Sequence, residues 1–196
     1  MVGPRIAEAA PAFKVDAVMP DGSFSTVSLE QFKGKKYVVL FFYPFDFTFV
    51  CPSEIIAFHK LSSEFEKRGC QVLGCSVDSK FVHTAWRNQE PRDGGIGKIS
   101  FPLLADVSRK MATDYGVLHP DGMAFRGLFL IDKDGILQHS VMNNLPLGRS
   151  VPEALRMLDA LQHFEKYGEV CPANWQAGEK AIKPTADGIK QYLSAF

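Results

Sequence analysis

The sequence lacks the features that define several large classes of protein. No apolar run approaches the roughly 18–20 residues of a bilayer-spanning helix, and the first residues lack the basic start and apolar stretch of a secretory signal. Positive charge is not in excess, because 22 acidic side chains balance 22 basic ones, whereas nucleic-acid-binding surfaces are strongly basic. We therefore expect a cytoplasmic protein that binds neither membranes nor nucleic acid.

Cysteine is scarce: the 196 residues contain only Cys51, Cys70, Cys75 and Cys171. This density is far below that of a disulfide-stabilised fold, and no two of them have the CxxC spacing of zinc sites and redox motifs. The five histidines do not pair at metal-ligand spacing either. We expect no metal and no bound cofactor, and each cysteine is either part of the core or a reactive thiol.

What is present is an ordinary globular composition with alternating strand and helix patterns. Hydrophobic residues make up 46% of the chain, which suits one domain or one domain with an appended arm. Residues 36–43 are almost wholly apolar, as in a strand buried on both faces, and residues 52–68 repeat apolar side chains at helical spacing. This order predicts an α/β fold of thioredoxin-like type, with a central mixed sheet flanked by helices. The other predicted elements are hairpins in residues 13–29 and 125–142, a strand at 70–77, and helices at 79–89, at 106–115 and after Ser150.

The composition changes near Gly168. Beyond it the chain has few long apolar runs and contains Pro172, Gly178, Pro184 and Gly188, which interrupt regular structure. We predict that residues 1–167 form the thioredoxin-like domain and that residues 168–196 form a C-terminal arm that packs on another surface.

Cys51 is the informative cysteine. It follows the apolar strand and directly precedes Pro52, which fits the first turn of a helix. There the unpaired N–H groups and the helix dipole favour a negative charge, and the thiolate is the nucleophilic form of cysteine. An inert core thiol is the commoner role, but Cys51 lies in a loop bounded by polar residues. Ionisation alone raises the thiolate fraction, and with it the reaction rate, by at most roughly 30-fold, because about 3% of an ordinary thiol is ionised at pH 7. Further acceleration therefore requires positioned donors.

Four segments resemble those of one enzyme family. Residues 42–52 contain the PxxxTxxC pattern with Pro44, Thr48 and Cys51, and resemble the peroxidatic-cysteine loop of peroxiredoxins. Cys171, within EVCPANW, resembles the resolving-cysteine segment of typical 2-Cys peroxiredoxins, and Arg126, within FRGLFLID, lies on a segment similar to the strand that carries their active-site arginine. Gly148-Arg149-Ser150 resembles a second arginine position, so the resemblance covers essentially the whole chain.

The resemblance implies a thiol-dependent peroxidase that takes hydrogen peroxide and organic hydroperoxides, with roles in antioxidant defence and redox signalling. The Cys51 thiolate would attack the terminal peroxide oxygen and become a sulfenic acid. Thr48 would hydrogen-bond the thiolate and the peroxide, Arg126 would stabilise the developing oxyanion, and Pro44 would shield the sulfur from water. Glu54 and Arg149 are the implied supporting partners.

The same resemblance implies how the enzyme is recycled. Cys171 of the partner chain in a homodimer would condense with the sulfenic acid to form an intersubunit disulfide. A thioredoxin-like protein or a flavoprotein reductase would then reduce that disulfide through a mixed disulfide. Because a sulfur in a helical turn cannot reach a distant thiol, we expect residues 48–54 to unfold locally in each cycle. A ring of five dimers is compatible with this scheme.

Two other functions compete with this interpretation. A thioredoxin-type disulfide oxidoreductase requires a second cysteine three residues after the first, and Glu54 occupies that position. A holdase chaperone, formed by the assembled oligomer, is allowed by the resemblance as a secondary role.

The other two cysteines and the aromatic residues near Cys51 are interpreted from their surroundings in the sequence. Cys70 and Cys75 lie in the apolar strand at 70–77 and are expected to be buried thiols. The aromatic residues Phe45, Phe47 and Phe49 are expected to form the apolar wall of a peroxide pocket.

The glycine-rich segment at 93–97 lacks the Lys-Ser/Thr of a nucleotide-binding loop. It resembles the GGLG element of over-oxidation-sensitive peroxiredoxins, with Ile96 in place of leucine, and Tyr192-Leu193 stands where those members have Tyr-Phe. Both changes keep an apolar residue, so we expect intermediate or retained sensitivity to sulfinic-acid formation.

Overall fold

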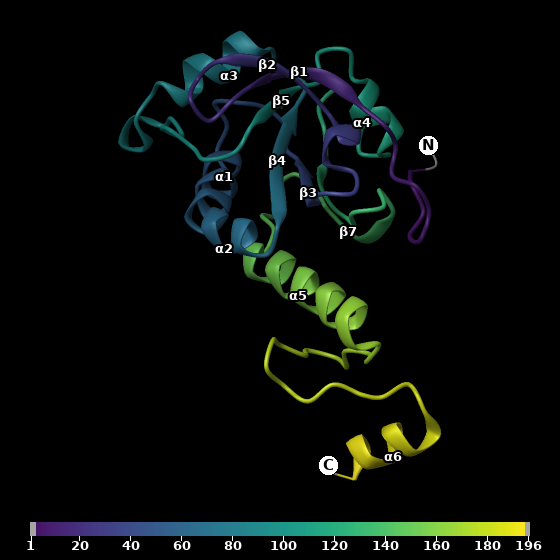
Figure 1. Cartoon of the computed structure of the whole chain (residues 1–196). Coiled ribbons are helices and arrows are strands. Elements are labelled where there is room, and N and C mark those ends of the chain that lie inside the picture. Colours follow the sequence, from purple (N-terminus) through teal and green to yellow (C-terminus); the bar gives the residue numbers. More distant parts are fainter. Residues whose placement is uncertain (1–2, 195–196) are drawn as a thin grey trace. The chain divides into compact units, whose positions relative to one another are not determined.

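The computed structural model describes residues 3–194 and contains two compact units, one up to Val151 and one from Pro152 onward (Figure 1). The first unit is built on a seven-stranded mixed sheet with strand order β2-β1-β5-β4-β3-β6-β7. This confirms the predicted α/β class with a mixed central sheet flanked by helices. The strands are β1 (Lys14–Val18), β2 (Phe24–Ser28), β3 (Tyr37–Phe42), β4 (Cys70–Ser76), β5 (Leu103–Ala105), β6 (Arg126–Ile131) and β7 (Leu137–Asn143).

Strand β3 lies near the centre of the sheet, and all six of its residues are buried. It pairs in parallel with β4, where Leu40 is opposite Leu73, and antiparallel with β6, where Leu40 is opposite Phe129. The nearly continuous apolar run that predicted this strand is explained by burial on both faces. The antiparallel pairing also brings the start of β6 beside the end of β3.

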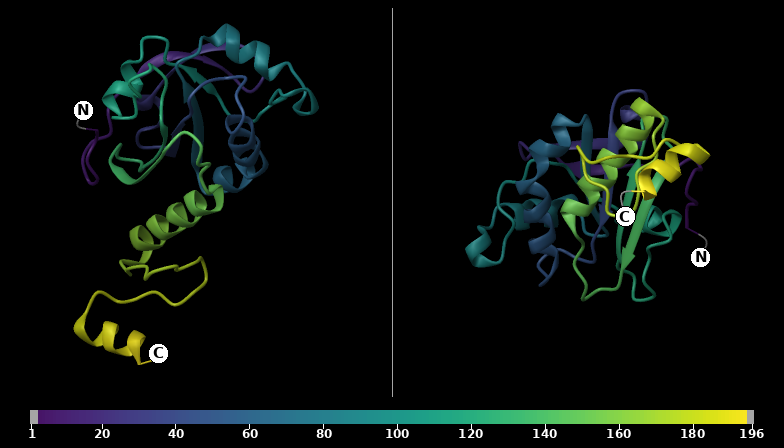
Figure 2. Two further views of the ribbon diagram at one scale, coloured as in Figure 1. Left: turned by 180° about the vertical axis from the view of Figure 1, so that it is seen from behind. Right: turned by 90° about the horizontal axis from the view of Figure 1, so that it is seen from below.

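Side chains of β3 alternate between the two faces of the sheet. Phe41 stacks on Phe58 of helix α1 (Cys51–Lys60), with ring centroids 4.3 Å apart. Phe42 faces the other way and packs in one core cluster with Met111 of helix α4 (Lys110–Asp114). Figures 1 and 2 show α1 and α4 on opposite sides of the sheet. The remaining helices of this unit are α2 (Ser62–Lys67), α3 (Lys80–Arg87) and the short 3-10 turns Leu29–Phe32 and Pro91–Asp93.

The structure differs from the sequence-based prediction at three elements. Strand β5 was not predicted, because three residues are too few to show a period. The predicted helix at 106–115 is shorter, since the Asp106 carboxylate accepts hydrogen bonds from the N–H groups of Met111 and Ala112 and the preceding residues form a turn. The single helix predicted at 52–68 is interrupted at Leu61, whose backbone leaves the helical conformation.

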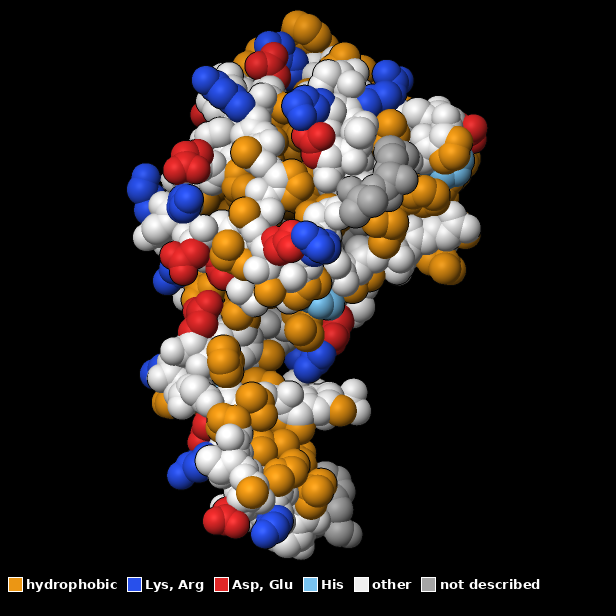
Figure 3. Space-filling view, turned by 90° about the vertical axis from the view of Figure 1, so that its right-hand side faces the viewer, with side chains coloured by type: hydrophobic (Ala, Val, Ile, Leu, Met, Phe, Trp, Pro, Cys, Tyr) orange, Lys and Arg blue, Asp and Glu red, His pale blue; other side chains and the backbone are white. Residues whose placement is uncertain are grey.

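The second unit consists mainly of helix α5 (Val151–Tyr167) and helix α6 (Ala186–Leu193). Between them Val170 and Ile182 form an isolated β-bridge, and the buried Trp175 donates its indole N–H to the carbonyl of Glu179. Figure 3 shows hydrophobic side chains gathered on the surface of this unit. The exposed ones are Phe164, Tyr167, Val170, Ile189 and Leu193.

None of the helices within residues 3–194 combines the length and the hydropathy needed to cross a membrane.

The stack of Phe58 on Phe41 gives a test of the fold. Phe58→Ala removes a fully buried ring and should lower the free energy of unfolding by about 3–5 kcal/mol. Phe49 is 97% exposed, so the matched change Phe49→Ala should shift it by less than about 0.5 kcal/mol. Urea unfolding of both variants measures the difference, and equal effects would contradict the packing described for α1.

Candidate active site

Cys51 lies at the junction between the central strand and helix α1. Strand β3 ends at Phe42, the loop that follows reaches Val50, and Cys51 is the first residue of the helix. Pro52 occupies the first turn, where its missing N–H costs nothing. The predicted placement at a helix N-terminus is therefore confirmed, and the side chain of Cys51 is fully buried.

Arg126 is brought to the sulfur by sheet topology. It is the first residue of β6, which runs antiparallel to β3. Its Nη1 donates to Cys51 Sγ at 3.4 Å and to Glu54 Oε2 at 2.7 Å, while its Nε donates to the carbonyl of Leu145 at 2.6 Å. The guanidinium is thus held on both sides and cannot easily turn away from the sulfur.

Glu54 connects the helix to two arginines. It lies one turn after Cys51, on the same face of α1. Its Oε1 accepts from the backbone N–H and the Nε of Arg149, both at 2.8 Å, and its Oε2 accepts from Arg149 Nη2 at 2.8 Å. Burial would raise the pKa of Glu54, but the hydrogen bonds and charge of Arg149, together with Arg126, hold that pKa below its usual range. The carboxyl is therefore ionised at neutral pH.

Arg149 is also held by backbone carbonyls. Its Nη1 donates to the carbonyls of Phe42, at 2.7 Å, and Gly127, at 2.5 Å, which are the adjoining ends of β3 and β6. Two guanidinium groups and one carboxylate leave one net positive charge beside the sulfur. A thiolate at Cys51 would neutralise that charge.

Thr48 and Pro44 lie in the loop before Cys51. The Thr48 hydroxyl donates its proton to the carbonyl of Phe45 at 2.8 Å. Its oxygen can therefore accept a further hydrogen bond, such as one from the O–H of a peroxide, but it has no second proton to donate to a thiolate. The expected hydrogen bond from Thr48 to the Cys51 thiolate is therefore not available in this conformation of the loop. Pro44 is buried at the base of the same loop.

The predicted aromatic wall is only partly present. Phe49 is 97% exposed, so the prediction that it lines a pocket is wrong for this chain. Phe47 is half exposed and packs on Trp86 of α3, with ring centroids 5.8 Å apart. The backbone at Phe47 has a φ of 56°, in the left-handed region.

Cys171 lies in the second unit and is partly buried. Its Sγ lies 3.6 Å from the carbonyl oxygen of Ala160. Burial raises the pKa of this thiol, and the nearby charge of Arg156 only partly offsets that effect. The side chain is therefore held as a neutral thiol in the absence of a partner.

The other two cysteines have the buried positions that the sequence predicts. Burial raises the pKa of Cys70 to about 12 and also raises the pKa of Cys75. Both lie on β4, an odd number of residues apart and hence on opposite faces. Neither is poised to form a thiolate.

Sequence reasoning missed one cluster next to the loop. The side chains of Asp46 and His83 are fully buried, with Asp46 Oδ2 2.7 Å from His83 Nδ1, and the Tyr43 hydroxyl donates to Asp46 Oδ1 at 2.8 Å. His83 stands at no characteristic spacing from Asp46 or Tyr43, so no sequence motif indicated this cluster. Across residues 3–194, no three His, Cys, Asp or Glu side chains are grouped so that they could hold a metal ion.

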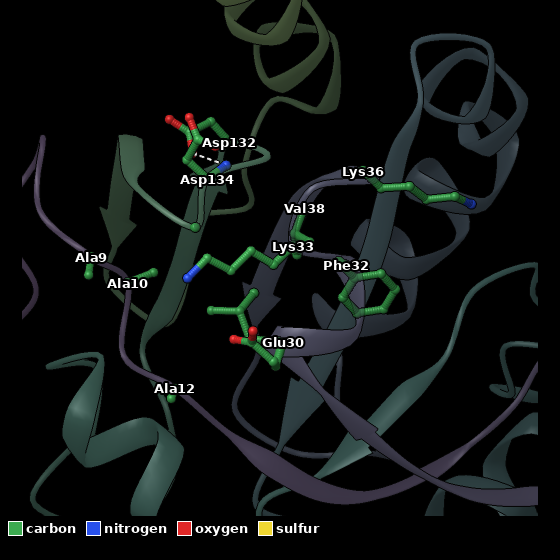
Figure 4. A pocket seen from close by; sticks show the side chains of 12 residues that line it. Ala9, Ala10, Ala12, Glu30, Phe32, Lys33, Lys36, Val38, Asp132 and Asp134 are labelled. Carbon is green, nitrogen blue, oxygen red and sulfur yellow. Dashed lines mark hydrogen bonds between the residues drawn. The ribbon is translucent and has the colours of Figure 1, made fainter.

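A separate pocket lies at the other end of β3 and β6 (Figure 4). Its volume is about 190 Å³. It has no cysteine or histidine in its lining, so it offers no nucleophile for peroxide chemistry. The lining consists of Ala9, Ala10, Ala12, Leu29, Glu30, Phe32, Lys33, Lys36, Val38, Asp132, Asp134 and Gly135.

The buried ion cluster gives a prediction for stability. Glu54→Gln leaves two buried guanidinium groups without their carboxylate and should lower the free energy of unfolding at pH 7 by about 3–5 kcal/mol. Because the pKa of Glu54 is lowered on folding, its stabilisation is present above the ordinary glutamate pKa of about 4.3 and is lost as the pH falls through the lower folded value.

The difference between wild type and Glu54→Gln should therefore shrink below about pH 4.3 in urea unfolding. Glu64→Gln, which removes an exposed carboxylate paired with Lys67 and Arg68, serves as the control and should change stability little. A difference that does not depend on pH would contradict the ionised cluster.

Comparison with known proteins places this geometry in a family. The model of the AhpC/TSA family matches residues 6–140, and that of the C-terminal domain of 1-Cys peroxiredoxin matches residues 160–195. Peroxiredoxin-2 of Macaca fascicularis is 56% identical over 191 residues, covering 97% of this chain and 96% of the relative. Thioredoxin peroxidase of Echinococcus granulosus is 52% identical over 191 residues, covering 97% and 98%.

A solved structure agrees with these matches. The reduced 2-Cys peroxiredoxin of Plasmodium vivax aligns with a TM-score of 0.95 at 54% identity, covering 96% of this chain and 98% of that one. The thioredoxin-like fold and the resemblance to 2-Cys peroxiredoxins are thereby confirmed. The chain belongs to the AhpC/TSA family and is a peroxiredoxin, an enzyme that reduces peroxides with a thiol.

Proposed function

We propose that Cys51 is the peroxidatic cysteine of this peroxidase and that Arg126, Thr48 and Pro44 complete its site. The observation that carries the proposal is the position of one nitrogen: Arg126 Nη1 contacts both Cys51 Sγ and the Glu54 carboxylate. A fixed cation beside a thiol at a helix N-terminus favours the reactive anion. The same cation faces the charge that develops as a peroxide bond breaks.

The chemical step follows from these positions. The Cys51 thiolate sulfur forms a bond to the terminal oxygen of a hydroperoxide, and the O–O bond breaks. The leaving oxygen takes up a proton and departs as water or an alcohol, while the sulfur becomes a sulfenic acid. The Thr48 oxygen accepts a hydrogen bond from the peroxide O–H and so orients the peroxide. Buried Pro44 restricts the approach of water.

Glu54 and Arg149 act on this step through Arg126. Glu54 binds both guanidinium groups, and Arg149 is tied to the carbonyls at the adjoining ends of β3 and β6. Together they hold Arg126 in place before the peroxide arrives, so no reorganisation is needed during the reaction.

Cys171 is proposed to be the resolving cysteine, supplied by the partner chain of a homodimer. The support is the surface of the second unit, where several large hydrophobic side chains are exposed (Figure 3) and would be covered by another chain. In this proposal residues 1–167 form the peroxidase domain and residues 168–196 the arm that carries Cys171. The last two residues of that arm lie outside the described part of the chain.

Disulfide formation requires the first turn of α1 to open. Cys51 is fully buried, so a second thiol cannot approach it in the closed form. We propose that residues 48–54 unfold locally after the sulfenic acid has formed. The Cys171 sulfur then bonds to the Cys51 sulfur and the sulfenic oxygen leaves as water.

The remaining proposals concern partners and location. The resulting disulfide is reduced by a thioredoxin-like protein or a flavoprotein reductase, with thioredoxin favoured by the name of the Echinococcus relative. We propose a cytoplasmic homodimer that can assemble into a ring of five dimers. We keep as predictions the holdase role, the roles in antioxidant defence and redox signalling, and the sensitivity to over-oxidation set by Ile96 and Leu193.

Cysteine variants test the assignment. Cys51→Ser should abolish peroxide consumption, because serine is not ionised at neutral pH. Cys171→Ser should still consume about one equivalent of peroxide per chain but should not turn over with thioredoxin as reductant. Cys70→Ser, which changes a buried thiol outside the site, is the matched control and should turn over like wild type.

Peroxide consumption in the presence and absence of reductant distinguishes these outcomes. Full multiple turnover by Cys51→Ser would refute the assignment of the peroxidatic cysteine. Full multiple turnover by Cys171→Ser would refute the assignment of the resolving cysteine alone.

A further inference from the structure

A second buried polar cluster holds the loop that precedes Cys51. Asp46 lies in this loop, and its carboxylate contacts His83 of α3 at 2.7 Å and the Tyr43 hydroxyl at 2.8 Å. The side chains of Asp46 and His83 have no exposed surface. None of these three residues takes part in the peroxide chemistry proposed above, and their burial is tolerated because they are paired with one another.

The hydrogen bonds assign the protons in the cluster. His83 Nε2 lies 3.1 Å from the carbonyl oxygen of Leu104, which can only accept, so Nε2 carries a proton. His83 Nδ1 faces Asp46 and shares one further proton with that carboxyl group. Burial raises the pKa of Tyr43, and the charge of Asp46 adds to the effect, so the phenol remains a donor.

The backbone at Asp46 is held as well. Its N–H donates to Asp78 Oδ2 at 2.9 Å, and the same oxygen accepts from the Ser76 hydroxyl at 2.8 Å. Asp46 is therefore fixed through both its side chain and its backbone, to groups just after β3, on α3 and just after β4.

Between Asp46 and Cys51 the chain is held mainly by local contacts, apart from the packing of Phe47 on Trp86. Phe47 has a φ of 56°, in the left-handed region that is unfavourable for a bulky side chain. Phe49 is 97% exposed, and the polar contacts of the loop at Thr48 and Ser53 are made to neighbouring backbone carbonyls. The seven residues 47–53 thus lie between two buried ionic clusters, at Asp46 and at Glu54.

We propose that Asp46, held by His83 and Tyr43, is a positioning residue that keeps the Cys51 turn closed and sets how often it opens. The inference rests on the proposed function in one respect, since it assumes that opening of this turn exposes Cys51 to a second thiol. Breaking the cluster removes an interaction of the closed loop and shifts the equilibrium toward the open form.

The opening frequency decides between two fates of the sulfenic acid. In the open form, Cys51–SOH and the thiol of Cys171 give a disulfide and water. In the closed form, Cys51–SOH reacts with a second hydrogen peroxide, is oxidised to the sulfinic acid, and the peroxide is reduced to water. A weaker cluster should therefore slow peroxide reduction, speed disulfide formation and lower the sulfinic yield.

Hydrogen exchange of the reduced protein, without peroxide, tests the cluster directly. Asp46→Ala leaves the buried Tyr43 and His83 donors unsatisfied and should speed exchange of the backbone N–H groups in residues 48–54, where all but Pro52 have one, by roughly tenfold or more. Tyr43→Phe removes one hydrogen bond and keeps the ring, so a smaller acceleration of about threefold is expected. This variant provides the test if Asp46→Ala folds poorly.

A conservative variant and a matched control separate positioning from general stability. Asp46→Asn can accept from Tyr43 and donate to the free Nδ1 of neutral His83, so exchange should return to within about threefold of wild type. Asp132→Ala removes a carboxylate that accepts from the N–H groups of Asp134 and Ile136 at the turn after β6. It should leave residues 48–54 unchanged.

Exchange at residues 48–54 that is unaltered in Asp46→Ala and Tyr43→Phe, or raised equally by Asp132→Ala, would overturn the proposal. The kinetic arm uses stopped-flow peroxide reduction and mass analysis of sulfinic product. A slower reduction step with a faster disulfide step supports the inference, because a merely structural defect would slow both. The exchange result stands even if Cys51→Ser retains activity, so failure of the proposed function and failure of this inference are distinguishable.

Discussion

The ion cluster formed by the Glu54 carboxylate and two arginine guanidinium groups is the interaction on which the site depends. It joins the first turn of α1, the start of β6 and the segment after β7 through bonds of 2.7–2.8 Å. A buried carboxylate would be costly alone, and two buried guanidinium groups would be costlier still. Each is tolerated because the others are present, and the net positive charge that remains faces Cys51. In the proposed cycle, the reactivity of the Cys51 thiol depends on how these three elements are held together.

This arrangement sets two requirements against each other. In the proposed cycle, peroxide reduction needs Cys51 closed in, with Arg126 beside the sulfur, whereas disulfide formation needs the same sulfur exposed. A short segment with a strained residue and an exposed ring lies between the buried clusters at Asp46 and Glu54, and this arrangement is compatible with both requirements. A segment of this kind can open without unfolding the sheet that carries the rest of the site.

The local parts of this description could be predicted from the sequence. The apolar run of β3, Pro52 after Cys51 and the motif around Arg126 each carry a signal within a few residues, and the structure places Cys51 and Arg126 in contact. The cluster of Asp46 and His83 could not be predicted, because it joins residues 37 positions apart through a side-chain hydrogen bond. Strand β5 is too short to show a period, and no composition rule gives the left-handed backbone of Phe47 or the exposure of Phe49.

In the proposed cycle, the Cys51 thiolate, held beside Arg126 in one chain, is oxidised by peroxide and then forms a disulfide with Cys171 of another chain. The most direct test is intact-mass and peptide analysis of the wild-type protein under non-reducing conditions, after one equivalent of hydrogen peroxide per chain. We expect a covalent dimer in which Cys51 of one chain is linked to Cys171 of the other, with Cys70 and Cys75 still reduced. A link within a single chain, or a disulfide that leaves Cys51 as a thiol, would contradict it.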